Sequence, residues 1–169
     1  MLLVGLYACD QAPTASAPAP PAQGAAPSQI LKNFEMQDIQ DGVRSMLLQS
    51  IEGNVFEQQH MAELRSPTVT FYKLGAVSSV MTSPSGRIDT ETHQIEAWGG
   101  VTVVTPDSTT LTTERLQYDP KIKKILSKEA VHLDKPDSVT DGIGLEADPD
   151  LTVVKIGKQH VRLKNNSKS

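Results

Sequence analysis

Apolar and polar residues alternate in short stretches over most of the chain from about residue 30 onward. Val101 and Val103 fall on one face of an extended segment with Thr102 on the other, and Val131 and Leu133 repeat this arrangement thirty residues later. Valine and threonine are frequent here, and their branched side chains suit a pleated surface. No apolar stripe with the helical period of 3.6 residues persists, so the pattern predicts β-strands.

Prolines divide this region where turns are expected. Proline presets φ for the second position of a turn, and neighbouring Asp, Ser and Gly residues supply side-chain hydrogen bonds or positive φ. Short strands separated by such turns are typical of an antiparallel sheet. The prolines in these settings are Pro84, Pro106, Pro120, Pro136 and Pro149.

Residues 34–51 are the ambiguous segment, because the alternation in 43–48 is imperfect and Gly42 interrupts it. A helix and a strand both remain open at this point. The alternation that is present favours strand.

The later strands resemble one another at a spacing of thirty residues. Residues 107–110 read Asp-Ser-Thr-Thr and residues 137–140 read Asp-Ser-Val-Thr, and Lys128, Val131 and Leu133 reappear as Lys158, Val161 and Leu163. Coincidence is one explanation, but the equal spacing of the valine-containing strands favours a repeat of two strands joined by a proline turn. A single two-stranded ribbon is marginal in water, so such units must stack to bury a shared face.

The shared face is predicted to be an aliphatic seam between two sheet layers. The chain has three Phe, three Tyr and one Trp, so aliphatic residues must supply most of the core. Each buried aliphatic side chain contributes roughly 1.5–3 kcal/mol. The residues predicted to face inward are Val69, Phe71, Ile95, Val101, Val103, Leu111, Leu116, Ile125, Val131 and Leu133.

The composition of the chain excludes several classes of protein. The chain has 169 residues, room for one domain, and a net charge of −4, which argues against a nucleic-acid binder. The single cysteine, Cys9, excludes an intramolecular disulfide framework and a multi-thiolate zinc site. No run approaches the roughly 20 apolar residues of a spanning helix.

The N-terminal region divides into two zones before the strands begin. Residues 1–9 are apolar and end in Leu6-Tyr7-Ala8-Cys9, which resembles a bacterial lipobox; the alternative is an apolar start with an incidental cysteine. Such a remnant of a signal peptide predicts lipidation of Cys9, with the true start upstream. Residues 10–29 are rich in Ala and Pro and are predicted to be a disordered linker to a domain over 30–164, with a tail at 165–169.

No catalytic or metal-binding pattern emerges. The four histidines, His60, His93, His132 and His160, show no ligand spacing, and carboxylate pairs flank prolines, where turn chemistry explains them. No nucleophile, Walker or dinucleotide motif is present. The sequence therefore predicts a protein that is not an enzyme and uses no cofactor or metal.

The order of these features resembles the LptC family, the periplasmic component of the lipopolysaccharide export machine. The resemblance covers about residues 34–163 and is of moderate specificity. It rests on an N-terminal anchor, a Pro-rich spacer and the motifs Asp41-Gly42-Val43, Ile95 to Val103 with Trp98-Gly99-Gly100, Pro106-Asp107-Ser108, and Ser138 to Glu146 with Gly144.

The resemblance implies an all-β fold, a twisted antiparallel β-jelly roll of two sheets in a V with an open groove. The implied function is to accept lipopolysaccharide from the inner-membrane ABC transporter and to pass it to LptA, at the periplasmic face of a Gram-negative inner membrane. The ten inward residues named above would bind lipid, contacting the acyl chains in the groove. Gly42 and Gly144 would occupy glycine positions of the family. The LptA-facing edge would include Leu151, Val153, Val161 and Leu163.

One departure from the family concerns the anchor. Typical members carry a transmembrane helix, whereas this chain offers Cys9, followed by Asp10, which resembles an inner-membrane retention signal. Alternatives are an LptA-like bridge, an outer-membrane assembly lipoprotein, or, in another class, a structural β-solenoid or a carbohydrate-binding lipoprotein.

Overall fold

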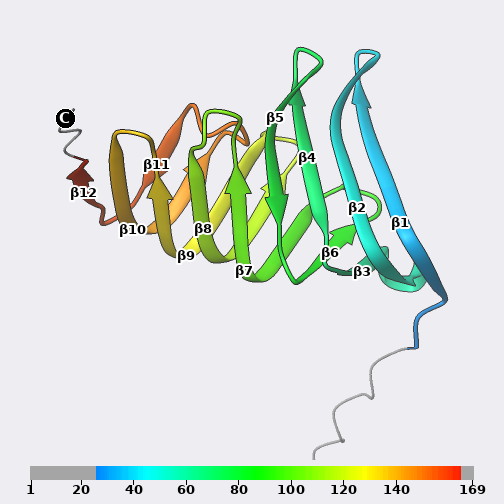
Figure 1. Cartoon of the computed structure of the whole chain (residues 1–169). Helices are drawn as coiled ribbons and strands as arrows, with labels where there is room; N and C mark the ends of the chain where they lie inside the picture. Colours follow the sequence, from blue (N-terminus) through cyan, green and yellow to red (C-terminus); the bar gives the residue numbers. More distant parts are fainter. Residues whose placement is uncertain (1–25, 165–169) are drawn as a thin grey trace, which may run out of the picture.

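A computed structural model describes residues 26–164, which form a single antiparallel sheet of twelve strands (Figure 1). One short 3-10 turn, η1 (Glu57–Gln59), interrupts the strands. The strands are β1 (Gln29–Gln40), β2 (Val43–Phe56), β3 (Met61–Arg65), β4 (Thr68–Lys73), β5 (Ala76–Thr82), β6 (Ser85–Asp89), β7 (Ile95–Val104), β8 (Thr110–Asp119), β9 (Lys124–Asp134), β10 (Ser138–Ala147), β11 (Val154–Ile156) and β12 (His160–Leu163).

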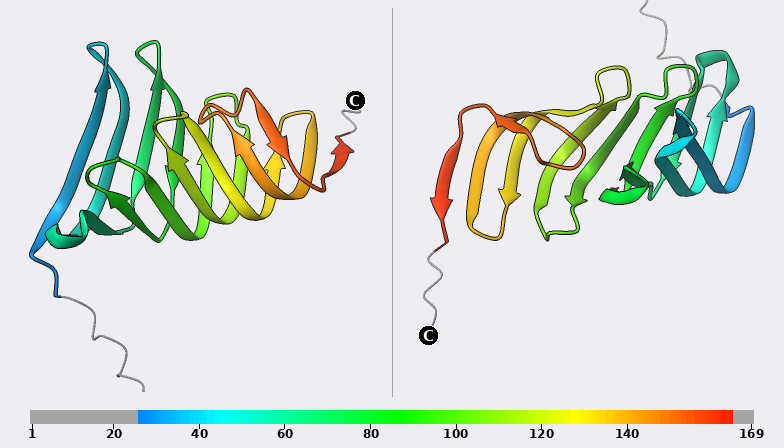
Figure 2. Two further views of the ribbon diagram at one scale, coloured as in Figure 1. Left: turned by 180° about the vertical axis from the view of Figure 1, so that it is seen from behind. Right: turned by 90° about the horizontal axis from the view of Figure 1, so that it is seen from above.

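The sheet folds back on itself because its long strands bend in the middle. The first half of β7 pairs with β6 and its second half pairs with β5, so β7 runs through two layers. We call these layers the β6 wall (β3, β6, β11 and the adjoining halves of the long strands) and the β5 wall (β4, β5, β12 and the other halves). The bends, together with the β3–β4 and β5–β6 connections, form a spine along one side, and most of the hairpin turns lie on the opposite side (Figures 1 and 2). This is the two-layered antiparallel architecture that the sequence predicts; parallel solenoid coils are absent from the described residues.

Each wall presents a continuous row of inward side chains, set by strand register. In the β5 wall, successive partners are Leu48, Val69, Met81, Val103, Leu111, Leu133, Thr140 and Val161. In the β6 wall they are Val55, Ala62, Ile88, Ile95, Tyr118, Ile125, Ala147 and Val154. Apart from Thr140 and the half-exposed Val161, the residues of the two rows belong to one hydrophobic core or pack against it. All ten residues expected to face inward are buried, with exposures of at most 3%.

The thirty-residue spacing has a direct structural expression. Ile95 and Ile125 both pair with Tyr118, and Val103 and Leu133 both pair with Leu111. Residues thirty apart therefore stand on either side of the same strand, which is what a run of equal hairpins produces. The five turn prolines all lie in connections between strands.

Hydroxyl groups satisfy backbone carbonyls at the bends. Ser50 Oγ donates to the carbonyls of Glu52 (2.8 Å) and Arg65 (2.7 Å), and Thr113 Oγ1 donates to the Ala130 carbonyl (2.9 Å). A bulge breaks the ladder of hydrogen bonds, and a buried backbone group without a partner is costly. Buried serine and threonine at the spine thus allow the sheet to bend.

The structure settles the ambiguous segment. Residues 34–51 are extended, and they form two strands joined by a tight turn in which Asp41 (φ 52°) and Gly42 (φ 77°) take positive φ. Gly144 (φ 82°) lies at a bulge in the middle of β10.

Gly142 is required by the path of the last strands. A Cβ there would lie 2.3 Å from Ile156 Cγ2 and 2.8 Å from the Gly157 carbonyl oxygen. The chain between β11 and β12 can therefore cross close to β10 only because residue 142 lacks a side chain.

Cys9 and the greater part of the expected linker lie outside the described residues. Within residues 26–164, no helix is long and apolar enough to span a bilayer.

Replacing the Thr113 hydroxyl tests the role of the spine. We expect Thr113→Val to lower the free energy of unfolding by about 1–3 kcal/mol, because the Ala130 carbonyl loses its partner inside the sheet. Urea denaturation followed by circular dichroism measures this. Thr112→Val, on the same strand but the opposite face, is the control and should change stability by less than about 0.5 kcal/mol. Equal effects of the two substitutions on stability would refute the structural role of the Thr113 hydroxyl at the spine.

Candidate binding groove

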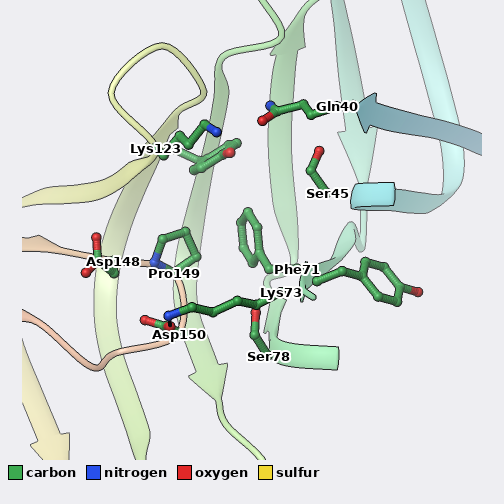
Figure 3. A pocket seen from close by; sticks show the side chains of 11 residues that line it. Gln40, Ser45, Phe71, Lys73, Ser78, Lys123, Asp148, Pro149 and Asp150 are labelled. Carbon is green, nitrogen blue, oxygen red and sulfur yellow. Dashed lines mark hydrogen bonds and ion pairs between the residues drawn. The ribbon is translucent and has the colours of Figure 1, made fainter. Parts of the chain in front are cut away.

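The two walls meet again at the side opposite the spine, and we call this side the mouth. A hollow of about 410 Å³ lies there (Figure 3). Its lining comes from both walls: Gln40, Ser45, Phe71, Tyr72, Lys73 and Ser78 from β1, β2, β4 and β5, and Tyr118, Lys123, Asp148, Pro149 and Asp150 from the opposite side.

The floor of the hollow is aromatic. Phe71 and Tyr118 are both buried, and their rings meet edge to face with centroids 4.8 Å apart. Burial raises the pKa of Tyr118 to about 12, with a smaller contribution from the carboxylates of Asp38 and Asp119. The phenol therefore stays neutral at physiological pH, and the floor carries no charge.

The rim of the hollow is charged and paired. Lys73 Nζ lies 2.5 Å from Asp150 Oδ2, and Lys124 Nζ lies 2.6 Å from Asp148 Oδ1. Burial acts to raise the pKa of the Asp150 carboxyl, but hydrogen bonds from Lys73 and Thr152 outweigh it, so the pKa is lowered. An apolar floor beneath a polar rim suits an amphiphile, with the fatty part inside and the polar part in water.

The seam itself is closed in this structure. The sequence led us to expect an open groove, but the inward residues of the two walls pack against each other and leave the hollow at the mouth as the accessible space beside the aromatic floor. The physical reason is that two long apolar surfaces facing water across a gap lower their free energy by closing onto each other. The groove is therefore a potential space that a ligand would have to open.

Both ends of the sheet carry a free strand edge. Among the described strands, β1 pairs only with β2, and β11 and β12 pair only with β10. Val153 and Val161 are half exposed and Leu163 is 79% exposed at the C-terminal end. Leu151, expected at the same edge, is instead buried in the core.

A small charged network holds β12 to the sheet. His132 Nδ1 lies 2.6 Å from Asp141 Oδ1, and Arg162 Nη2 lies 3.0 Å from Asp141 Oδ2, which links β9, β10 and β12. The hydrogen bond with His132 is the largest factor that lowers the pKa of the Asp141 carboxyl. Sequence reasoning assigned His132 only to an outward strand position, because nothing in the local sequence shows that it faces Asp141 nine residues later.

Other features of the described residues offer no chemistry. Trp98 lies on the outer face, where the Arg115 guanidinium stacks 5.5 Å from its ring centre. Residues 26–164 contain no cluster of three or more His, Cys, Asp or Glu side chains that could hold a metal ion. A bent two-walled sheet with an apolar interior and a polar mouth defines a protein of the two-layered antiparallel β-jelly-roll class.

The chain belongs to the LptC-related lipopolysaccharide-assembly family, whose model matches residues 1–164. The fold is similar to the crystal structure of LptH from Pseudomonas aeruginosa, described as the LptA-homologous periplasmic component of the lipopolysaccharide transport device. That likeness has a TM-score of 0.53 at 13% identity and covers 70% of this chain and 93% of LptH. No curated protein sequence matches the chain.

The Asp141 network predicts a pH-dependent stability. Folding lowers the pKa of this carboxyl, so the ionised form stabilises the fold above its unfolded pKa of about 4, and that contribution is lost as pH falls through the lower folded value. We expect Asp141→Asn to lower the thermal midpoint at pH 7 and to converge with wild type near pH ~2. Thermal unfolding by circular dichroism across this range measures it, with Asp137→Asn in the adjacent turn as control. A pH-independent difference would contradict the prediction.

Proposed function

We propose that this protein is a periplasmic, inner-membrane-anchored carrier that accepts lipopolysaccharide from the ABC transporter of the export system and passes it to LptA. Membership of the LptC-related family supports the lipopolysaccharide-transport role. The observation that carries the proposal is the pair of unbroken inward rows, which run from β2 through β10 to the C-terminal strands. Acyl chains of the ligand would lie between these rows.

The energetic logic follows from the hydrophobic effect. Each methylene exposed to water costs about 0.8 kcal/mol, so a lipid with several acyl chains needs a continuous apolar path across an aqueous compartment. Once the two walls separate, the rows would offer such a path along the sheet, while the polar rim at Lys73 and Lys123 leaves sugars in water. Transfer from one groove to the next requires no covalent step, in keeping with a protein that is not an enzyme.

The free strand edges at the two ends of the sheet support separate docking sites for LptA and for the transporter subunits. An unpaired edge can accept a strand from another chain, which extends one sheet into the next. We assign the edge formed by β11 and β12, with Val153, Val161 and Leu163, to LptA. We assign the β1 edge to the transporter subunits, because the presumed anchor precedes β1 and holds this end near the membrane.

Photo-crosslinking tests lipid binding at matched positions. Phe71 and Thr70 are adjacent on β4, but Phe71 is buried and lines the hollow, whereas Thr70 is partly exposed on the outer face and does not line it. We expect benzoylphenylalanine at position 71 to capture lipopolysaccharide at least about fivefold more than at position 70, because acyl chains are excluded from the outer face.

Inward and outward positions on two other strands test whether the difference at β4 comes from the label itself. Val103 faces inward and Thr102 outward on β7, and His132 is the outward neighbour of the inward Val131 and Leu133. Circular dichroism of each labelled protein confirms folding before capture is compared. Equal capture on both faces would overturn the proposed function.

Isolation of the protein from membranes tests the anchor and the partners together. We expect the mature N-terminal peptide to begin at Cys9 and to carry acyl mass, and we expect transporter subunits and LptA to copurify. Cys9→Ser should release the protein from the membrane fraction, because one remaining apolar stretch binds a bilayer weakly. An unmodified Cys9 in membrane-bound protein would refute lipid anchoring, and copurification of neither partner would refute the placing of the edges.

A further inference from the structure

The turn between β10 and β11 crosses the mouth from one wall to the other. We call residues 148–151 the strap. It begins at the end of β10 in the β6 wall and reaches β4 and β5 in the β5 wall, which are not neighbours of β10 in the sheet order. The view into the mouth shows this connection lying over the strands between them (Figure 2, right).

Two polar contacts fasten the strap to the far wall. Ser79 Oγ, at 0% exposure for the residue, donates a hydrogen bond of 2.6 Å to the Pro149 carbonyl. Lys73 Nζ lies 2.5 Å from Asp150 Oδ2. The partners are separated by 70 and 77 residues along the chain, further than those of any other side-chain hydrogen bond among the described residues.

Leu151 ends the strap with a buried side chain in a strained conformation. Its φ is 55°, in the left-handed region that disfavours residues other than glycine, and the residue is 4% exposed. Its amide donates to the Asp148 carbonyl at 2.9 Å, which fixes the tight turn. The strain is compensated by placing an apolar side chain in the core.

The strap also forms one side of the hollow at the mouth. Pro149 and Asp150 line it opposite Phe71 (Figure 3), and the buried Leu151 directly follows them in the chain. Elsewhere the packed walls close the seam. A ligand that enters the hollow therefore meets the strap.

We propose that the strap is a gate: it closes the mouth with Leu151 in the place of an acyl chain, and it swings away from β4 and β5 to let acyl chains reach the seam. This inference rests on the proposed function for the identity of the ligand. The strap is suited to opening because its ion pair is partly exposed, with Lys73 at 62% side-chain exposure, and because release relieves the strain at Leu151. An entering acyl chain would fill the space that Leu151 leaves.

Thiol labelling measures opening of the strap without any ligand. In the full chain carrying Cys9→Ser, Ser79→Cys places a single thiol directly beneath the strap, and Ala62→Cys places one in the core of the β6 wall, away from it. We expect Asp150→Asn to speed maleimide labelling at position 79 by about threefold to tenfold, since it removes the charge that Lys73 holds while retaining an oxygen for Thr152. Labelling at position 62 should not change, because the core as a whole stays folded.

Glu146→Gln is the matched control. It breaks an ion pair with Lys155, also between β10 and β11, but one that does not reach the far wall. Equal labelling of Ser79→Cys with and without Asp150→Asn would overturn the gate, as would acceleration at position 62 to the same extent, which would report global unfolding.

Lipopolysaccharide capture at position 71 then separates the gate from the proposed function. We expect Asp150→Asn to raise the initial rate of capture severalfold. If Asp150→Asn speeds thiol labelling but position 71 captures no lipopolysaccharide with or without that substitution, the strap is a gate to the core and lipopolysaccharide is not its ligand. Faster labelling with an unchanged rate of capture would overturn the gate as the entry route and leave the proposed function standing.

Discussion

The structure depends on bending each long strand once, so that one sheet supplies both walls of the interior. Bending interrupts the backbone ladder, and the protein satisfies the freed carbonyls with buried hydroxyls such as those of Ser50 and Thr113. Where a hydroxyl does not serve, glycine takes positive φ, as at Gly99, Gly100 and Gly144. The apolar rows on the two walls can face each other only because these bends lie side by side along the spine.

Facing rows explain how one interior can pack as a core and, on the proposed function, also admit a ligand. A globular core needs close packing, whereas a lipid groove needs a path that can open. In this fold the hydrogen bonds of the sheet run within the walls. Apart from the contacts of Ser79 and Lys73 with the strap, the walls meet chiefly through aliphatic side chains. Aliphatic contacts have no directional requirement, so acyl chains can substitute for them with little loss.

The alternation of residue types in the sequence was sufficient to predict the strands, the proline turns and the inward side chains. Ile95, Val103 and Ile125 all lie where period two places them, because burial of one face fixes register. The resemblance to the LptC family, carried mainly by glycines and turns, is confirmed by the family match. Its functional residues remain proposals, since burial alone does not distinguish lipid contact from packing.

Contacts between distant segments could not be predicted in this way. Leu151 was placed at a partner edge because the family resemblance assigns residues 151–163 to that end. Its neighbours Pro149 and Asp150 contact Ser79 and Lys73 across the mouth, and this crossing brings Leu151 into the core. The closed seam was missed for a related reason: the sequence shows which residues are apolar, but the distance between two walls depends on whether anything lies between them.

The two ends of the sheet differ in a way that gives the molecule polarity. β1 presents an edge of twelve residues, irregular at Asn33 (φ 52°) and between Asp38 and Ile39, whereas β11 and β12 present three and four, separated by a crossing at Gly157. A head-to-tail contact between identical copies would set a long border against a short broken one, and most amides of the long border would stay unmatched. Such a shape disfavours filaments of this chain alone and favours a single link with a fixed direction in a row of unlike members.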